Sequence, residues 1–277
     1  MKVILRNRLF LISTILVLMV SLDISLNVSI LKQKNLITKV LAQTTENIEK
    51  PKPLFKYIEI TEGCDHSFRD GCVNVRSGPG KDYKIVSRLR NRTVLKVDSV
   101  ETRNGEDWYK ISFDEWLRYP DRITEDWYVS ADVSNLFYNE GTVELNKKTF
   151  VQNNKHIVIS LSEQTLYAYD GDYLFMKEKV STGVKDTETP TGNFIIYRKT
   201  PSRYMQGPIP GATEKEYDTP GVPWDLYFTK DGAVIHGAFW HNNFGKVFSN
   251  GCVNLPPEKA KILYAWADVG VPVIVNE

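Results

Sequence analysis

A histidine and a cysteine near the C-terminus carry the strongest chemical signal in this sequence. His236 is followed by a glycine and Cys252 is preceded by one, with a polar, aromatic loop between them. A cysteine thiolate is a strong nucleophile, and a nearby imidazole can accept its proton. Glycine beside the cysteine lets a substrate carbonyl approach the main chain, whose N–H groups can stabilise an oxyanion. The pair therefore predicts cysteine acyl transfer.

The residues around this pair separate it from a buried cysteine and a structural histidine that share the same spacing. Residues 233–235 are apolar and predict a strand that ends at His236. Residues 249–254 are polar and predict a tight turn outside the core. A rigid strand end suits a general base, so we favour His236 over His241, which lies in the middle of the loop.

The turn around the cysteine supplies the groups that would assist it. The main-chain N–H groups of Asn250, Gly251 and Cys252 are the expected oxyanion donors. Ser249 and Asn254 are expected to stabilise the turn through side-chain bonds to the main chain. The candidates for a substrate groove, which could equally serve in packing, are Trp224, Tyr227, Trp240 and His241.

These residues bring the chain close to a known family. The stretch IHGAFWHNNFG…SNGCVNL (235–255) resembles the active-site signature of the bacterial L,D-transpeptidases, a His-Gly followed by Ser/Thr-His-Gly-Cys-x-Asn/Arg. The resemblance extends upstream through 156–196, with Ser-Thr-Gly at 181–183 and Thr-Pro-Thr-Gly at 189–192, and covers 153–277. The family has histidine where this chain has Asn250, so one supporting element of the site differs.

The resemblance implies a reaction and roles for the residues. Cys252 would be the nucleophile and His236 its base, with the ring oriented by the carbonyl of Gly237 and with no metal or cofactor. The substrate would be a peptidoglycan stem peptide, cut after its third residue and joined to the side-chain amine of a neighbouring stem. Water as acceptor would instead make the protein an L,D-carboxypeptidase, and a decayed site would leave a wall-binding protein. Papain-like endopeptidases place the cysteine before the histidine, and the order here argues against them.

The preceding region predicts a separate, small β domain. CVNVRSGPGKDYKIVSRL (72–89), DWYKI (107–111) and DWYVSADVSNL (126–136) resemble the bacterial Src-homology-three-like (SH3-like) domains that often tether envelope enzymes to the wall. Trp108-Tyr109 and Trp127-Tyr128 are expected in its core. The predicted strands are Tyr57–Ile60, Val73–Val75, Ile85–Leu89, Thr93–Val97, Trp108–Phe113 and Trp127–Val129.

The C-terminal half predicts a second β domain with one helix. Pro256 to Asp268 is the predicted helix, because prolines open it, apolar residues recur at helical spacing and a glycine follows it. Residues 200–222 are rich in Pro, Gly and charge and predict a long loop at the substrate groove. The predicted strands are His156–Leu161, Thr165–Tyr169, Tyr173–Val180, Asn193–Tyr197 and Val271–Val275. The predicted fold class is therefore mainly β: a small SH3-like barrel, then an L,D-transpeptidase-type β domain with one C-terminal helix.

The N-terminus predicts export. Lys2, Arg6 and Arg8 precede the mostly apolar Leu9–Leu22, so residues 1–42 are either a cleaved signal peptide or a membrane anchor. The expected location is the periplasm or cell wall. The predicted order is export segment 1–42, linker 43–54, SH3-like domain 55–139 and catalytic domain 150–277.

Charge and cysteines agree with this scheme. The 35 basic and 34 acidic residues nearly balance, and the absence of a basic run argues against a nucleic-acid partner. Of three cysteines, Cys64 and Cys72 are close enough to form a disulfide or to remain a free pair. Either way Cys252 is left unpaired, as a nucleophile must be. With His66 they would give only three zinc ligands at untypical spacing, which argues against a metal site.

Overall fold

The structure is a computed structural model, and it describes residues 31–34, 53–68, 71–150, 153–209 and 213–277. The chain divides into two units, Met1–Lys52 and Pro53–Glu277. In the first, only the helical residues 31–34 are described, so the predicted export segment at 1–42 and the linker at 43–54 lie almost wholly outside the described residues. No helix among the described residues combines the length and the apolar character that crossing a membrane requires.

The region from 55 to 139 forms one antiparallel sheet with strand order β3-β2-β6-β5-β4-β1-β7. Its core contains Ile58, Val75, Leu95 and Val129, and the predicted core residue Trp108 is also buried. The structure therefore confirms a small all-β domain here. Its strands are β1 (Phe55–Ile60), β2 (Val73–Arg76), β3 (Ile85–Leu89), β4 (Val94–Arg103), β5 (Glu106–Ile111), β6 (Tyr128–Ser130) and β7 (Ser134–Asn139).

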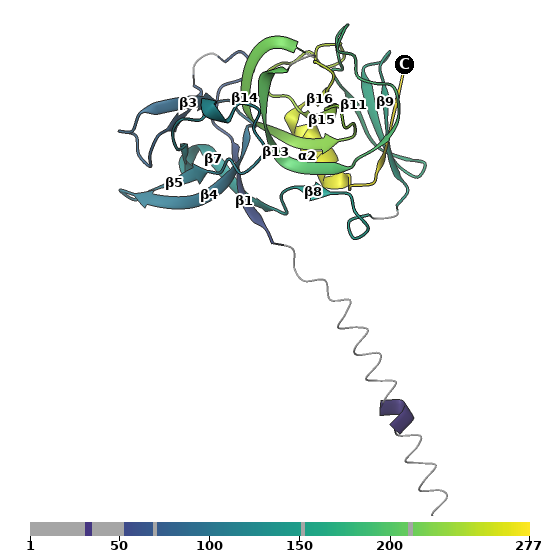
Figure 1. The fold of residues 1–277 in the computed structure, drawn as a ribbon, viewed down its shortest axis with the longest axis horizontal. Coiled ribbons are helices and arrows are strands. Elements are labelled where there is room, and N and C mark those ends of the chain that lie inside the picture. Colours follow the sequence, from purple (N-terminus) through teal and green to yellow (C-terminus); the bar gives the residue numbers. More distant parts are fainter. Residues whose placement is uncertain (1–30, 35–52, 69–70, 151–152, 210–212) are drawn as a thin grey trace, which may run out of the picture. The chain divides into compact units, whose positions relative to one another are not determined.

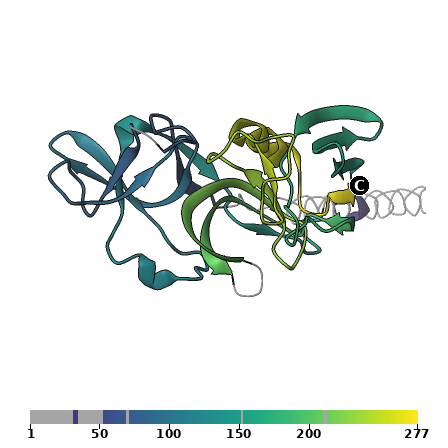
Figure 2. The same ribbon diagram turned by 90° about the horizontal axis from the view of Figure 1, so that it is seen from above.

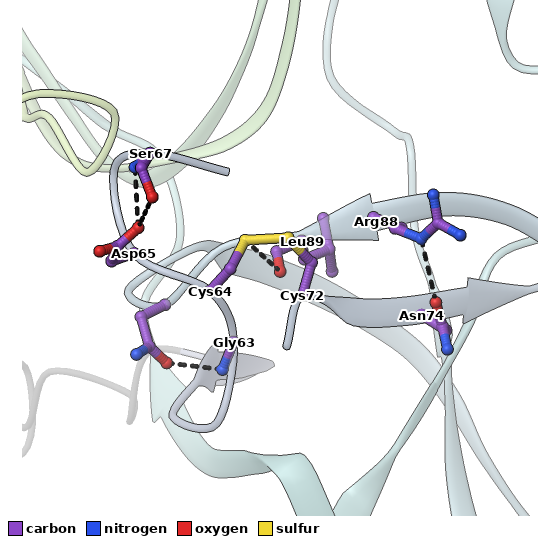
Figure 3. The surroundings of a disulfide bond; sticks show 9 residues. Gly63, Cys64, Asp65, Ser67, Cys72, Asn74, Arg88 and Leu89 are labelled. Carbon is purple, nitrogen blue, oxygen red and sulfur yellow. Dashed lines mark hydrogen bonds between the residues drawn. A yellow bond between two sulfur atoms is a disulfide. The ribbon is translucent and has the colours of Figure 1, made fainter. Parts of the chain in front are cut away.

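A disulfide joins Cys64 to Cys72, with the two Cα atoms 4.2 Å apart (Figure 3). Cys64 also forms a β-bridge with Arg90, directly after β3, and its sulfur lies 4.0 Å from the carbonyl oxygen of Leu89. The disulfide thus holds the segment before β2 against the end of β3. The sequence allowed either a disulfide or a free pair at Cys64 and Cys72, and the structure has the disulfide. Cys252 is the free cysteine.

The C-terminal region contains two five-stranded sheets that share one hydrophobic core. Their orders are β11-β10-β9-β17-β12 and β16-β15-β14-β13-β8. Core residues include Ile157 and Val273 from the first sheet and Leu226, Ile235 and Val253 from the second. The strands are β8 (Val143–Glu144), β9 (Lys155–Ser160), β10 (Thr165–Asp170), β11 (Tyr173–Lys179), β12 (Gly192–Ile195), β13 (Arg198–Ile209), β14 (Thr213–Tyr227), β15 (Val234–Gly237), β16 (Val253–Leu255) and β17 (Pro272–Asn276).

The predicted loop at 200–222 is wrong. Strands β13 and β14 pair over this stretch as a long, curved hairpin, drawn in green in Figures 1 and 2. Pro220 and Gly221 lie at the register shift between Arg203 and Met205, and Pro208 lies at the shift between Gly207 and Ile209, so these residues mark irregularities within the hairpin. Proline is tolerated at such irregularities because no ladder hydrogen bond is lost there.

The predicted helix is confirmed as α2 (Pro257–Trp266), which packs against β14 and β15. Pro257 occupies the first helical position, where its missing N–H costs nothing. Ala260, Leu263 and Tyr264 are the buried residues, and they join the core of the two sheets. The helix thus supports β14 and β15, two of the strands that carry the candidate site.

Candidate active site

The spacing between His236 and Cys252 follows from how their strands pair. Strands β15 and β16 are parallel neighbours, with His236 opposite Asn254. A parallel pair needs a long crossover, and residues 238–252 provide it. Because alternate side chains share a face, Cys252, Asn254 and His236 all lie on one face, while Ile235 and Val253 point into the core.

The same face continues across the sheet onto the hairpin. Tyr227 of β14 lies opposite Val234, two positions before His236, and Arg198 of β13 lies opposite Tyr227. Asp225, two positions before Tyr227, shares this face. The side chains beside the cysteine therefore come from four strands of one sheet.

His236 is held by the main chain in a neutral, proton-accepting form. The ring is 1 % exposed, its Nδ1 lies 3.0 Å from the carbonyl oxygen of Gly237, and its Nε2 is buried without a partner. Because a carbonyl only accepts, Nδ1 carries the proton and Nε2 has a free lone pair. Burial lowers the pKa of His236 to about 3, so the ring is neutral at neutral pH. The expected orienting role of Gly237 is present in the structure.

Close packing explains why glycine follows this histidine. A Cβ at position 237 would lie 3.0 Å from Cα of Pro257 and 2.9 Å from Cγ of Pro223. A larger residue would push β15 away from the start of α2. On the other side, the ring of Trp240 covers His236, with 5.7 Å between centroids.

Cys252 lies at the end of the crossover and is partly exposed. Its sulfur is 3.8 Å from the carbonyl oxygen of Gly232. Burial of the sulfur raises the pKa of the thiol, and the positive charge of Arg203 opposes this rise. A raised thiol pKa beside a lowered imidazole pKa means that both groups are neutral at rest.

The turn before the cysteine is fixed by side-chain bonds to the main chain. The hydroxyl of Ser249 donates to the carbonyl of Cys252 and accepts from the N–H of Gly251 at 3.2 Å, as expected for Ser249. Gly251 has a φ of +103°, a conformation that favours glycine. Because the Gly251 N–H is already occupied, the N–H groups of Asn250 and Cys252 are the better candidates for an oxyanion hole.

The two upstream turns of the sequence signature pack against this loop. Main-chain bonds link Ser181 with Asn254 in both directions, at 3.0 and 2.8 Å, and join Val184 to Ser249 at 2.9 Å. The hydroxyl of Thr189 accepts from the N–H of Gly183 at 3.0 Å and donates to the carbonyl of Gly251 at 2.9 Å. The motifs at 181–183 and 189–192 therefore brace the cysteine loop.

His241 is placed to support and not to accept a proton. Its Nδ1 accepts from the N–H of Asn243 at 3.1 Å, and its Nε2 lies 2.9 Å from Nδ2 of Asn254. Burial lowers the pKa of His241 to about 4. Because Nδ1 accepts, the neutral ring carries its proton on Nε2, so neither nitrogen has a free lone pair to offer. Asn254 correspondingly binds this side chain, instead of the main chain that the sequence suggested.

The remaining candidates separate by burial. Asn250 is exposed at the surface of the loop. Trp224 is 4 % exposed and packs in the core against Phe137 and Tyr264. Of the two roles suggested for it, groove lining and packing, the structure shows packing. Tyr227 is partly exposed on the face that carries Cys252.

Three residues near the cysteine were missed by the sequence reasoning: Arg203, Tyr217 and Asp225. Arg203 acts electrostatically on Cys252 and on His236. Asp225 is fully buried with both oxygens unpartnered, and burial raises its pKa well above the ordinary value. An acid inside the apolar run around 222–228 was the available signal. Within the described part of the chain, no three His, Cys, Asp or Glu side chains are grouped to hold a metal ion.

Several comparisons with known proteins name L,D-transpeptidases. Residues 154–275 match the family model of the L,D-transpeptidase catalytic domain, and residues 71–121 match that of the bacterial SH3 domain. A curated Bacillus licheniformis protein named as L,D-transpeptidase YkuD is 28 % identical over 102 residues, which cover 36 % of this chain and 52 % of that protein. The match thus spans about half the length of this relative.

Solved structures of the same name are also similar to this chain. An Enterococcus faecium L,D-transpeptidase mutant has 24 % identity and a TM-score of 0.41, covering 46 % of this chain and 50 % of its own. An L,D-transpeptidase from Mycobacterium smegmatis has 20 % identity and a TM-score of 0.43, covering 66 % of this chain and 99 % of its own. The two family models thus match an L,D-transpeptidase catalytic domain at 154–275 and, before it, a bacterial SH3 domain at 71–121.

Proposed function

We propose that the protein is a peptidoglycan L,D-transpeptidase in which Cys252 is the nucleophile and His236 its general base. One observation carries the proposal. The free thiol and the imidazole lie on the same face of a parallel strand pair, and the imidazole holds its proton on Nδ1 and leaves Nε2 unpartnered. A general base must have this combination of a fixed ring and a free lone pair.

In the first half-reaction the Cys252 sulfur attacks the carbonyl carbon of the third residue of a stem tetrapeptide. The thiol proton passes to Nε2 of His236, and the N–H groups of Asn250 and Cys252 hold the oxyanion. When the C–N bond breaks, the imidazolium returns that proton to the amine of the leaving D-alanine. A thioester on Cys252 remains.

In the second half-reaction the neutral side-chain amine of another stem attacks the thioester. His236 takes the proton that the amine loses, and the departing sulfur then recovers it as a thiol. The product is a cross-link between third residues, and no cofactor enters the balance. Water in place of the amine would give a tripeptide and L,D-carboxypeptidase activity.

We also propose that the catalytic part acts outside the cytoplasm. The Cys64–Cys72 disulfide supports this location, because disulfides persist in oxidising compartments. The polybasic and apolar start of the sequence, Lys2 to Leu22, supplies the export signal. Whether that segment is removed would be measured by the N-terminal sequence of protein isolated from the envelope.

The deciding experiment incubates the full chain with purified tetrapeptide muropeptides and analyses the products by mass. A cross-linked dimer with released D-alanine is expected. Tripeptide without dimer would identify a carboxypeptidase. No product, together with no acylation of Cys252 by a carbapenem, would indicate a decayed site and overturn the proposal.

A further inference from the structure

The β13–β14 hairpin is anchored by the SH3-like domain. The segment 113–122, which lies between β5 and β6 and ends in a 3-10 turn at Pro120–Arg122, contacts the hairpin along its length. A two-stranded ribbon has little stability in water by itself. Support from this segment is therefore part of what keeps the hairpin in place.

The first anchor lies at the first register shift. Tyr204 sits between Arg203 and Met205, where the ladder with β14 is interrupted, and its N–H donates to Oε2 of Glu115 at 3.0 Å. The ring of Tyr204 packs against Phe113 and Trp127, with centroids 5.9 and 6.3 Å apart. The SH3-like domain thus supplies the partner that the strand lacks.

The next anchors lie at the second register shift. Arg122 donates from Nη1 to the carbonyl of Tyr217 at 3.1 Å and from Nη2 to the carbonyl of Gly207 at 2.9 Å. Gly207 and Tyr217 are opposite each other in the ladder, so one guanidinium joins both strands. Tyr119 adds two bonds to the Gln206 side chain, at 2.8 and 3.1 Å, and one from its hydroxyl to the carbonyl of Pro208 at 2.7 Å.

These anchors determine what faces the cysteine. Arg203 directly precedes Tyr204, so fixing Tyr204 on the SH3-like domain also restricts the position of the Arg203 side chain. The guanidinium of Arg203 lies 5.5 Å from the ring centre of Tyr227, which shares a face with Cys252. The charge of Arg203 acts on Cys252 and on His236, and Tyr217 also interacts electrostatically with Cys252.

We propose that the 113–122 segment is a positioning element of the active site, and that Arg122 acts through Arg203 to set the reactivity of Cys252. The two domains then form one catalytic unit, and the SH3-like domain is more than a tether. The proposal deepens the proposed function and rests on it for its biological meaning. It predicts that a substitution at Arg122, in the SH3-like domain, alters the pH dependence of the reactivity of the Cys252 thiol.

The test uses the full chain and measures how fast iodoacetamide alkylates the thiol as a function of pH. Cys252 is the free cysteine, so alkylation reports on that residue. Arg203 lowers the thiol pKa, so displacing Arg203 must raise the pH at which alkylation becomes fast. We expect this upward shift in Arg122→Ala, with muropeptide kcat reduced roughly ten- to hundredfold.

The matched control is Arg118→Ala. Arg118 carries the same charge in the same segment and also acts electrostatically on Tyr217, but it is exposed and stacks on Trp116 at 5.3 Å. We expect it to stay within about twofold of the parent protein, and Arg122→Lys to recover part of the loss because one N–H bond can still form. Arg122→Ala that behaves like Arg118→Ala would overturn the proposal.

A double variant separates positioning from general damage. Arg203→Gln alone should reproduce the upward shift, and Arg122→Ala should add nothing further in that background. A full additional shift would show that Arg122 does not act through Arg203. Should Arg122→Ala lose its cooperative thermal transition, Tyr119→Phe, which removes only the bond to the carbonyl of Pro208, decides the matter. A smaller shift of the same sign supports the proposal, and no shift rejects it.

The alkylation and turnover measurements test the two proposals separately. A parent protein that turns over no muropeptide would refute the proposed function, while the pH profile of alkylation would still report on the anchoring of the hairpin.

Discussion

The two walls of the candidate active site are held in different ways. The cysteine loop is bonded within its own domain, by Ser249, Thr189 and the main chain of 181–184. The β13–β14 hairpin depends on Glu115, Tyr119 and Arg122 of the SH3-like domain. The first wall holds the proposed nucleophile, and the second holds the charged Arg203 that interacts with it. A catalytic motif can therefore be complete while its electrostatic surroundings come from another domain.

The largest effect is expected at the nucleophile. Cys252→Ala should abolish thioester formation and turnover, because no other group can replace the sulfur. The change removes a single heavy atom from a residue that is in neither hydrophobic core, so the thermal unfolding temperature should change little. Mass analysis after exposure to a carbapenem checks this. Continued acylation of the variant would move the nucleophile elsewhere.

His236→Ala should reduce turnover by about 10²–10⁴-fold, the usual effect of removing a general base. His241→Ala is the matched comparison, since that histidine is also buried beside the cysteine loop but has both ring nitrogens engaged. It should cost less activity and more stability. A damaging His241→Ala beside a harmless His236→Ala would reverse the assignment of the base.

The two walls should respond to acid in opposite directions. Burial lowers the pKa of His236 to about 3 and that of His241 to about 4, below the unfolded value of about 6.5, so the unfolded chain binds more protons between these limits. As the pH falls from about 6.5, the contribution of His241 to the unfolding free energy is lost towards pH 4 and that of His236 towards pH 3. The total is several kcal/mol, at about 1.4 kcal/mol per pKa unit for each group.

Burial raises the pKa of Glu115 and of Asp225 on the hairpin side. Those carboxyls contribute stability at low pH and lose it as the pH rises above about 4. Denaturant unfolding at several pH values measures the balance. His241→Gln should flatten the acid side of the profile, and Asp225→Asn should raise stability at neutral pH. An unchanged profile in both variants would refute the assigned directions.

Thr189→Val should weaken the loop around Cys252 and leave the β13–β14 hairpin unaffected. It keeps the shape of the side chain but leaves the N–H of Gly183 and the carbonyl of Gly251 without their partner. We expect a loss of about 2 kcal/mol in unfolding free energy and a slower acylation of Cys252. Thr187→Val, whose hydroxyl makes one long 3.5 Å bond, is the control. Equal effects in the two variants would show that the bracing is unimportant.

The smallest effect is expected at Asn250. Its side chain is exposed, and its main-chain N–H, the group that would bind the oxyanion, survives any substitution. Asn250→His should change turnover by no more than about tenfold between pH 5 and 8, which is about 1.4 kcal/mol. An inactive parent that gains activity on this change would favour the decayed-enzyme alternative.

Much of the fold followed from local patterns. Most strands appeared within a few residues of their predicted positions, and the helix from 257 to 266 matched its proline and glycine signals. The error at 200–222 has a physical cause. Proline ends a strand only where its N–H would be needed, and Pro208 and Pro220 fall at register shifts where the ladder is already interrupted.

The sequence by itself determined the pair His236 and Cys252, the tight turn at Gly251 and the bracing motifs at 181–183 and 189–192. Their partners lie close along the chain or in one signature, so residue type and spacing carry the information. Only the tertiary structure decided that Arg203 would act on the thiol and that Arg122 would hold its strand. The two Arg122 bonds join residues 85 and 95 positions apart, and the carbonyls of Gly207 and Tyr217 accept from whichever donor the fold brings. Every residue type has a main-chain carbonyl, so no local sequence pattern indicates which donor will bind it.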